Sequence, residues 1–168
     1  MPKDVFAAPS VWDRLLATDE RGADRYAQAQ SFEQLRAAIA RDLEGLLNTR
    51  VAWSDDMFTA HPEAFASVLN YGLCDFAGKC LTSSEDRAAI CTSVSAVIAR
   101  FEPRLTGVEV NVFGVETATN RLDFIIAGTV KGHDAVGRTE FNAMLTPSTL
   151  QYSVSQSARR VQPEKVAA

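Results

Sequence analysis

The sequence predicts an α+β domain in which helices pack on one face of a small, mainly antiparallel β-sheet. Two amphipathic helical patterns occupy residues 31–48 and 84–101. Short alternating segments follow between residues 108 and 155, and turn-forming residues separate them. Helices followed by a run of strands are the order that this fold class shows.

The helix predicted over residues 84–101 has clear signals at both ends. Ser83 or Ser84 can cap its first turn. Pro103 has no N–H to donate and disfavours helical backbone at the residue before it, so the helix must end there. Its apolar face, at helical spacing, consists of Ile90, Val94, Val97, Ile98 and Phe101. The chain is therefore expected to turn at Glu102-Pro103-Arg104.

A second helix is predicted over residues 31–48, because Ser31 and Gln34 form a capping-box pattern. Its apolar stripe consists of Phe32, Leu35, Ile39, Leu43, Leu46 and Leu47. Gly45 costs such a helix roughly 1 kcal/mol relative to alanine, so we expect a partner or another element to approach closely there. Asn48 can end the helix in the left-handed conformation, and Arg50 lies near the negative end of the helix dipole.

Residues 51–81 break into turns and short pieces. Pro62 suits the first turn of a helix, which we expect to carry Phe65, Val68 and Leu69. The segment Asn70-Tyr71-Gly72 is a stop signal. Three apolar residues are expected to cover the core from this loop, namely Leu73, Phe76 and Leu81.

Extended segments are predicted from alternation and β-favouring composition. Val108, Val110 and Val112 alternate with polar residues, as in a strand with one buried face. Three further segments are residues 122–130, a strand with Phe141, Ala143 and Leu145, and residues 149–155. Residues 115–121 and 131–138 are the predicted connections.

The chain is expected to divide into an arm, one domain and a tail. Residues 1–30 form the arm and its linker, with Trp12 on the apolar side of a short helix. This arm either docks on another protein or covers the core of its own domain. Residues 31–155 form the α+β domain, and residues 156–168 form a flexible polar tail.

Composition and charge exclude several function classes. A hydrophobic fraction of 46% with 23% charged residues is ordinary for a globular protein. A net charge of −4 without a basic cluster argues against binding to nucleic acid. The N-terminus lacks the pattern of a signal peptide, and no apolar run is long enough to span a bilayer. We therefore expect a cytoplasmic protein without direct membrane insertion.

The three cysteines do not form the pattern of a disulfide framework. Cys74, Cys80 and Cys91 are odd in number and lack CxxC spacing, so reduced thiols are expected. A zinc site of Cys74, Cys80 and His61 matches no common spacing and lacks a close second pair of ligands. We expect no metal and no cofactor.

Motifs for catalysis are absent from the sequence, including nucleophile elbows and phosphate-binding glycine loops. Glu102 with Asp123 is the carboxylate pair that could be considered for glycoside hydrolysis, which needs two carboxylates facing each other across a cleft. Acidic residues are usually solvated, so this pair is a weak candidate. We expect no enzymatic activity and no small-molecule substrate.

Three separated motifs resemble the TssE family in order and spacing. They are Asp42-Leu43-Glu44-Gly45-Leu46-Leu47-Asn48-Thr49-Arg50, Ser67-Val68-Leu69-Asn70-Tyr71-Gly72-Leu73-Cys74-Asp75-Phe76 and Phe101-Glu102-Pro103-Arg104-Leu105. Residues 11–15 also resemble the N-terminal arm of the family. The chain departs from the family pattern at Gly45, where an aromatic residue is common, and at Cys74, where a proline is common.

The resemblance implies a baseplate subunit of a bacterial type VI secretion system, similar to the wedge protein that initiates the sheath in contractile phage tails. Its partners would be the wedge core of the baseplate and the contractile sheath subunits, at a baseplate docked to the inner-membrane complex. The implied partner contacts are Glu102, Pro103, Arg104, Asp42, Asn48, Arg50 and Trp12. An internal Glu102–Arg104 pair that locks the helix to the following strand is the structural alternative.

A mechanism without chemistry follows from the predicted sheet. An exposed edge strand can accept a strand of another chain through main-chain hydrogen bonds, and in the family the first ring of sheath subunits is thought to join in this way. Strand pairing would also fix the register of that ring. Two alternatives are a regulatory anti-adaptor, which shares a similar fold, and a peptidoglycan hydrolase, after the older description of the family as lysozyme-like.

Overall fold

The computed structural model describes residues 32–51, 53, 55–65, 67–76, 78–80, 83–116, 121–130, 138–146, 149 and 151–157. The helical elements in these ranges are α3 (Phe32–Asn48), η1 (Asp55–Phe58), α4 (Pro62–Phe65), η2 (Val68–Asn70) and α5 (Ser84–Phe101). The strands are β1 (Leu105–Glu116), β2 (Arg121–Val130), β3 (Arg138–Thr146) and β4 (Gln151–Gln156). The predicted arm with Trp12, the Ser31 cap and most of the predicted tail lie outside the described residues.

The strands form one antiparallel sheet in the order β1-β2-β3-β4, so β1 and β4 are its edges. Val110 pairs with Ile126 across the first two strands, and Phe141 pairs with Ile126 across the next two. Each strand follows its neighbour in sequence, as in a chain of hairpins. The predicted α+β class is therefore confirmed.

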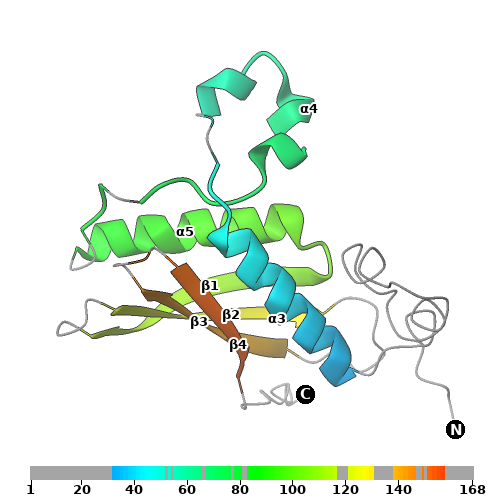
Figure 1. The fold of residues 1–168 in the computed structure, drawn as a ribbon, viewed down its shortest axis with the longest axis vertical. Helices are drawn as coiled ribbons and strands as arrows, with labels where there is room; N and C mark the ends of the chain where they lie inside the picture. The colour runs from blue at the N-terminus through cyan, green and yellow to red at the C-terminus, as the bar shows by residue number, and fades with distance from the viewer. Residues whose placement is uncertain are drawn as a thin grey trace, which may run out of the picture.

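Both long helices lie on the same face of the sheet (Figure 1), with α5 packed along β1 and α3 across β4. The core lies between the helices and the sheet, and its fully buried side chains include Leu43 and Leu47 of α3, Ile90 and Ile98 of α5, and Phe124 and Phe141 of the sheet. Both predicted apolar helix faces are buried there or packed against it. None of the helices in the described ranges is both long and apolar enough to cross a membrane.

The observed β1 is longer than the predicted strand at both ends. It begins at Leu105 and continues to Glu116, so the chain is still extended where we expected the connection to begin at residue 115. The register between β1 and β2 shifts between Thr106 and Glu109, where Gly107 has a φ of 59°. A glycine in this left-handed region permits a β-bulge, which lets the strand start close to the end of α5.

No other element of the described chain approaches Gly45 closely, so that part of the expectation is wrong, while a partner at Gly45 stays a prediction. Gly45 is exposed, and nothing lies within 4 Å of the place that a Cβ would occupy. The expectation for Arg50 is confirmed, because its guanidinium donates a hydrogen bond of 2.7 Å to the Leu47 carbonyl at the C-terminal end of α3.

The segment from Trp53 to Asn70, which we call the knob, projects beyond the two long helices (Figure 1). The helix predicted to carry Val68 and Leu69 ends at Phe65, and both residues lie in η2 with exposed side chains. Ser67 explains this end, since its hydroxyl accepts from the Leu69 N–H and donates to the Ala64 carbonyl at 2.7 Å. Such local bonds compete with the continuation of a helix.

The two ends of the knob are joined at a neck. The Val51 N–H donates to the Leu73 carbonyl at 3.0 Å, and the Leu73 N–H donates to the Thr49 carbonyl at 2.9 Å. Gly72 has a φ of 122°, and a Cβ there would lie 2.6 Å from the Thr49 carbonyl oxygen, so only glycine fits. Leu73 is fully buried and Phe76 packs against the core, as predicted, whereas Leu81 lies outside the described residues.

Candidate partner-binding site

The turn after α5 is built around Glu102. Its backbone N–H donates to the Ile98 carbonyl at 2.8 Å, and its own carbonyl accepts from the Leu105 N–H at 3.1 Å. The carboxylate also folds back and accepts from the Arg104 N–H at 3.1 Å. Pro103 is exposed at the tip of this turn. Glu102 therefore closes the helix and fixes the direction in which β1 begins.

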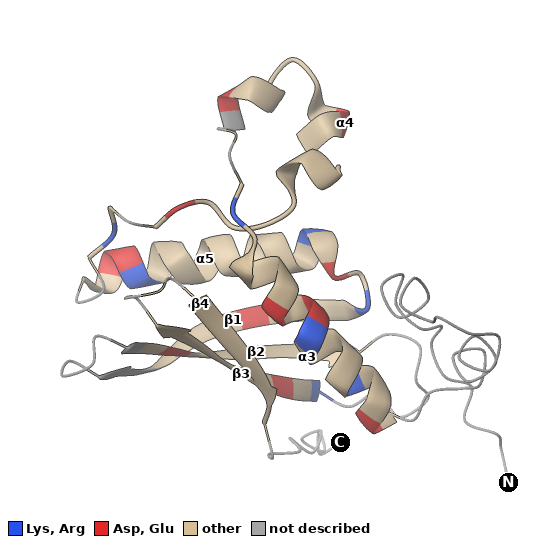
Figure 2. Cartoon of the chain, viewed as in Figure 1, with Lys and Arg blue, Asp and Glu red and all other residues tan. Residues whose placement is uncertain are grey.

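A buried ion network joins this turn to α3. The Arg104 Nε donates to Glu102 Oε1 at 2.7 Å, and Nη2 donates to Asp42 Oδ2 at 2.7 Å. Nη2 also contacts Glu102 Oε2. Arg41 extends the network, with its Nε 3.7 Å from Asp42 Oδ1. Acidic and basic segments accordingly lie next to each other in two places in Figure 2, the middle of α3 and the turn after α5.

The network is shielded from solvent. The exposed fraction is 5% for the Glu102 side chain, 14% for Asp42 and 18% for Arg104. Burial alone would lower the pKa of Arg104, but the hydrogen bonds and negative charges of Glu102 and Asp42 outweigh it and raise that pKa. The guanidinium is thus held in its charged form. Its Nη1 is buried without a hydrogen-bond partner among the described residues.

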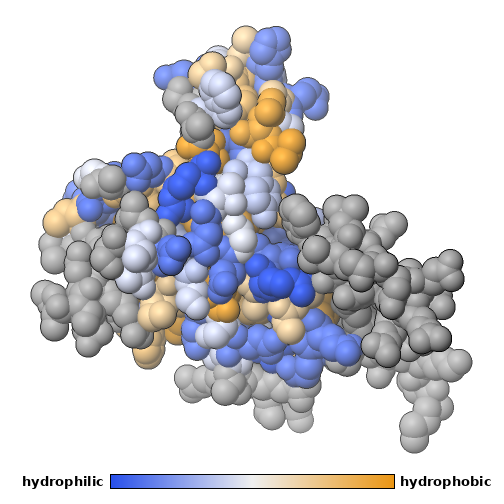
Figure 3. All heavy atoms as spheres, viewed as in Figure 1, coloured by the Kyte–Doolittle hydropathy of each residue, from blue (hydrophilic) through white to orange (hydrophobic). Residues whose placement is uncertain are grey.

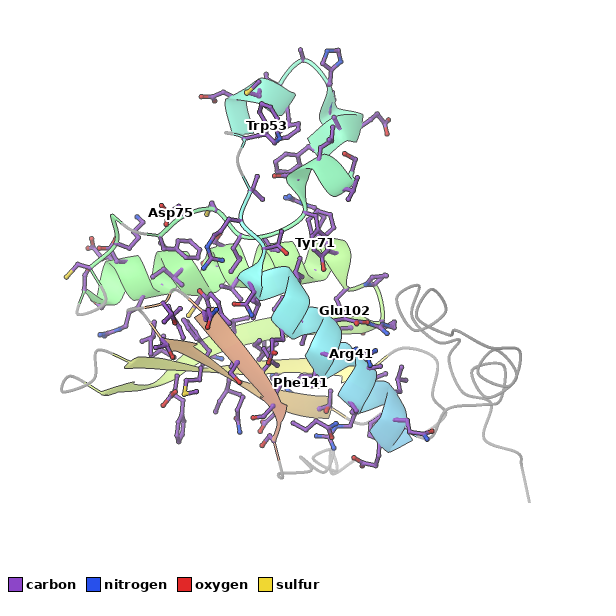
Figure 4. All side chains as sticks on the ribbon, in the orientation of Figure 1. Arg41, Trp53, Tyr71, Asp75, Glu102 and Phe141 are labelled. Carbon is purple, nitrogen blue, oxygen red and sulfur yellow. The ribbon has the colours of Figure 1, made fainter. Side chains whose placement is uncertain are left out.

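Tyr71 borders this network from the neck of the knob (Figure 4). Its ring packs edge-to-face against Phe101, with centroids 5.2 Å apart. Burial raises the pKa of the Tyr71 hydroxyl, and the charges of Asp42 and Glu102 raise it further. The phenol therefore stays neutral beside two carboxylates.

The three motifs that resemble the TssE family meet in this part of the fold. Asp42 of the first motif binds Arg104 of the third, and Thr49 of the first packs against Gly72 of the second. Tyr71 of the second packs against Phe101 of the third. Residues up to 62 positions apart are thereby tied together. The internal Glu102–Arg104 pair that we considered as an alternative is present.

The edge formed by β4 is occupied by side chains of α3. The Asn48 amide donates to the Tyr152 carbonyl at 2.8 Å and accepts from the Tyr152 N–H at 2.8 Å. One turn earlier, Glu44 Oε2 accepts from the Val154 N–H at 2.8 Å. Covering a sheet edge in this way prevents pairing with another chain. Asn48 thus has a structural task, and sequence reasoning missed the role of Glu44.

Arg36 continues this contact toward the start of α3. It is buried, its Nε donates to the Thr139 hydroxyl at 2.9 Å, and its Nη2 donates to the Ser157 carbonyl at 3.0 Å. The i, i+4 spacing of Glu44 and Asn48 was the available signal for a polar face directed at the sheet. The α3 helix therefore bonds β4 at Tyr152 and Val154, and Arg36 extends these contacts to β3 and to the residue after β4.

The edge formed by β1 is different. A groove of about 550 Å³ separates it from α5 and is lined by Cys91, Thr92, Ser95, Ala96 and Ala99 of the helix and by residues 108–111 of the strand. Short side chains reach the strand backbone here, since the Ser95 hydroxyl donates to the Val108 carbonyl at 3.0 Å and the Val112 backbone hydrogen-bonds Cys91. Thr92, Ala96 and Ala99 are exposed. The β1 edge therefore bonds α5 at Val108 and Val112, and a groove lined mainly by small side chains adjoins it.

The structure separates the carboxylates considered for hydrolysis. Glu102 is buried at the end of α5, on the helix-covered face. Asp123 lies between the core residues Leu122 and Phe124 in β2, so its side chain points to the opposite face, where it lines a hollow with Phe113 and Met144. The two cannot act across one cleft.

Within the described residues no group of three or more His, Cys, Asp and Glu side chains is placed to hold a metal ion. Cys74, Cys80 and Cys91 form no disulfide there. Burial raises the pKa of Cys91, and this outweighs the Val112 hydrogen bond and the charge of Arg87, which lower it. The buried polar groups are arranged for contacts between elements of the fold.

Comparison with known proteins places this arrangement in a family. No curated protein matches the chain. The family described as baseplate wedge protein gp25 matches residues 33–135, more than half of the chain, including α3, the knob, α5, the Glu102 turn, β1 and β2. This match supports a structural role in a baseplate, with contacts to other baseplate components. The chain therefore belongs to the baseplate wedge protein gp25 family, which corresponds to TssE in type VI secretion.

Proposed function

We propose that this protein is a cytoplasmic scaffold of a type VI baseplate that docks on the wedge core and initiates the contractile sheath by accepting a sheath strand at β1. The observation that carries the choice of strand is the difference between the two sheet edges. Tyr152 and Val154 of β4 bond to the long side chains Asn48 and Glu44 of α3. The bonds of β1 to α5, at Val108 and Val112, come from the short side chains of Ser95 and Cys91, and an open groove lies beside them. An arriving strand would have to displace long side chains of α3 at β4, whereas at β1 it would enter the groove and displace only the short side chains of Ser95 and Cys91.

The groove suits a main-chain partner. Ala96 and Ala99 present only methyl groups, so a backbone can approach the β1 edge beneath α5. The Ser95 hydroxyl, which bonds Val108, can rotate to bond the arriving chain. Pairing along β1 would place the first sheath subunit in a fixed register, because a shift of one residue would turn every side chain to the other face. No reaction and no cofactor are needed.

Docking on the wedge core is assigned to the turn at Glu102-Pro103-Arg104. The ion network with Asp42 holds this turn rigid, and Pro103 with the accessible part of Arg104 forms its outer surface. A rigid turn loses little conformational entropy on binding. Asn48 and Arg50 act inside the fold, so they support this surface indirectly. Trp12 in the arm is a second docking contact, at a baseplate attached to the inner-membrane complex.

A pair of tryptophan substitutions tests the role of β1. Ala96→Trp fills the groove, whereas Ala37→Trp places the same side chain on an exposed position of α3, which packs on β4. Both replace an exposed alanine inside a long helix, so their effects on helix propensity match. Ala96→Trp is expected to abolish capture of purified sheath subunits while Ala37→Trp retains it. Equal capture by both variants would contradict pairing at β1.

A further inference from the structure

The exposed large apolar side chains of the described residues are concentrated in the knob. Phe113 of β1 is 77% exposed, and the other four are Trp53, Met57, Val68 and Leu69. Val68 reaches 81% exposure. The space-filling view shows hydrophobic spheres gathered on the knob, above the hydrophilic surface of the long helices (Figure 3). Exposed apolar side chains that gather on one projecting segment are typical of an interaction site.

The knob is held in one position by packing at its base. The Phe58 and Phe65 rings meet edge-to-face with centroids 5.9 Å apart, and the Arg100 guanidinium of α5 lies 3.9 Å from the centroid of Phe65. The Asn70 side chain is buried and donates to the Phe65 carbonyl at 3.1 Å. The neck bonds between Val51 and Leu73 complete the closure. The apolar surface is therefore preorganised for binding.

The charged residues of the knob are all acidic. Residues 51–78 contain no lysine or arginine, whereas Asp56 and Glu63 are exposed on the knob. Acidic segments and no basic ones accordingly appear above the neck in Figure 2. A partner that receives the whole knob would also meet these carboxylates. Electrostatic complementarity requires basic side chains around the apolar contact.

We propose that the knob inserts into an apolar groove rimmed by lysine and arginine on another subunit of the baseplate wedge. The proposal deepens the scaffold function proposed above and rests on it. The knob contact is separate from the β1 groove, which receives the sheath. This protein would thus be attached to the wedge by the knob and would present β1 to the sheath at a separate surface.

A second copy of this chain is a poorer partner. The hollow on the open face of the sheet contains Phe113 and Met144, but Asp123 and Glu140 line it as well. The groove beside β1 contains Glu109. Both surfaces would bring carboxylates against the acidic knob, and juxtaposed like charges disfavour association. An anionic membrane surface would repel the knob for the same reason.

The test uses the full chain and the purified wedge and sheath subunits of the same secretion system. Val68→Ser with Leu69→Ser removes exposed apolar surface without opening the core, and Phe113→Ser is the matched control outside the knob. The double variant is expected to bind the wedge subunits about tenfold or more weakly, the loss typical of interface hot spots. Binding of the double variant to sheath subunits is expected to stay unchanged. Because Phe113 lies in β1, the control applies to wedge binding, in which it is expected to match wild type.

A charge-reversal variant tests the basic rim. Asp56→Lys with Glu63→Lys is expected to slow association with the wedge subunits and to remove its acceleration at low salt, because steering depends on the carboxylates. Equal association rates at low salt for this variant and wild type would contradict the proposal that lysine and arginine rim the partner groove.

Other outcomes overturn the knob proposal in distinguishable ways. Wedge binding that survives the Val68 and Leu69 changes would contradict it and leave the scaffold function standing. Dimerisation of wild type in sedimentation, lost in the double variant, would identify a second copy as the partner. In a Trp12→Phe variant Trp53 is the sole tryptophan. If acrylamide fails to quench its fluorescence in the free protein, the chain covers its own knob. Failure of wild type to bind any wedge or sheath subunit would instead reject the scaffold function.

Discussion

Replacing Arg104 by methionine is expected to destabilise the fold severely. The change keeps an unbranched side chain of similar reach but removes the guanidinium that binds both Glu102 and Asp42. Glu102 would then remain as a carboxylate with a 5% exposed side chain and only the Arg104 N–H as its partner in the turn. A buried charge that loses its ion-pair partner is costly because it can neither rehydrate nor find a new counterion.

The magnitude follows from this burial. Breaking a buried ion pair on one side typically costs about 3–5 kcal/mol, a large part of the roughly 5–15 kcal/mol that stabilises a domain. Glu102→Gln with Arg104→Met removes the stranded charge, so the double variant should cost clearly less than the sum of the two single changes. The coupling arises because the same two groups neutralise each other in the folded protein.

Urea unfolding of wild type, both single variants and the double variant measures this coupling. The Arg104→Met variant should show a lower midpoint with an unchanged slope. A loss below about 1 kcal/mol, the range of exposed ion pairs, would refute the buried network. Additive single changes would refute it too. Wedge binding is then interpreted only at temperatures where each variant remains folded.

Three further changes test other parts of the fold. Gly45→Ala is expected to raise the free energy of unfolding by about 1 kcal/mol, because a Cβ meets no neighbour there, and thermal unfolding measures this gain. Weaker wedge binding by the stabilised variant would indicate a partner at Gly45. Asn48→Ala removes both hydrogen bonds to Tyr152 and is expected to lower the free energy of unfolding by about 1–3 kcal/mol, measured by chemical denaturation. It is also expected to promote self-association through the uncovered β4 edge, measured by size-exclusion chromatography. An unchanged denaturation midpoint would contradict the role of this clamp, the pair of Asn48–Tyr152 hydrogen bonds. Burial, partly opposed by the charge of Arg50, raises the pKa of Tyr152 to about 12, so its contribution to stability is complete below pH 10 and is lost as pH rises toward 12, by about 3 kcal/mol in total. Its buried hydroxyl has no partner within the described residues, so Tyr152→Phe should be at least as stable as wild type at neutral pH and should lack this alkaline loss; equal alkaline loss in both proteins would contradict the assignment.

Regular elements of the fold were predictable because their signals are local. The period of Ile90, Val94 and Ile98 defined α5, and the alternation around Val110 defined β1. The knob was mispredicted for a local reason too, since the Ser67 hydroxyl ends the helix that Pro62 begins. Turn chemistry of this kind outweighed the apolar pattern of Val68 and Leu69.

The candidate site depends on contacts that sequence spacing does not contain. Glu102 and Arg104 were predicted together because they flank Pro103, but the link from Arg104 to Asp42 joins residues 62 positions apart. The clamp of Asn48 on Tyr152 spans 104 positions. Both contacts arise only when α3 packs across the sheet. Sequence reasoning therefore named several of the residues without assigning their internal partners.

Gly72 illustrates that residues of the three motifs can serve the fold and not a partner contact. Its positive φ and the 2.6 Å approach of the Thr49 carbonyl exclude any side chain at the neck. Tyr71 beside it packs on Phe101 next to the ion network. These residues hold the knob and the turn in place, while Val68 and Pro103 form their outer surfaces. We therefore propose that the exposed residues positioned by these motifs make the partner contacts.

Hydrogen exchange of the intact protein, with and without purified sheath subunits, tests most directly whether β1 is the strand that receives the sheath. Amides buried in a new strand pair become protected, and the two sheet edges lie in separate peptides. We predict new protection within residues 105–116 and no change within residues 151–157. New protection confined to residues 151–157, or none in either edge while the sheath subunit is bound, would contradict pairing at β1.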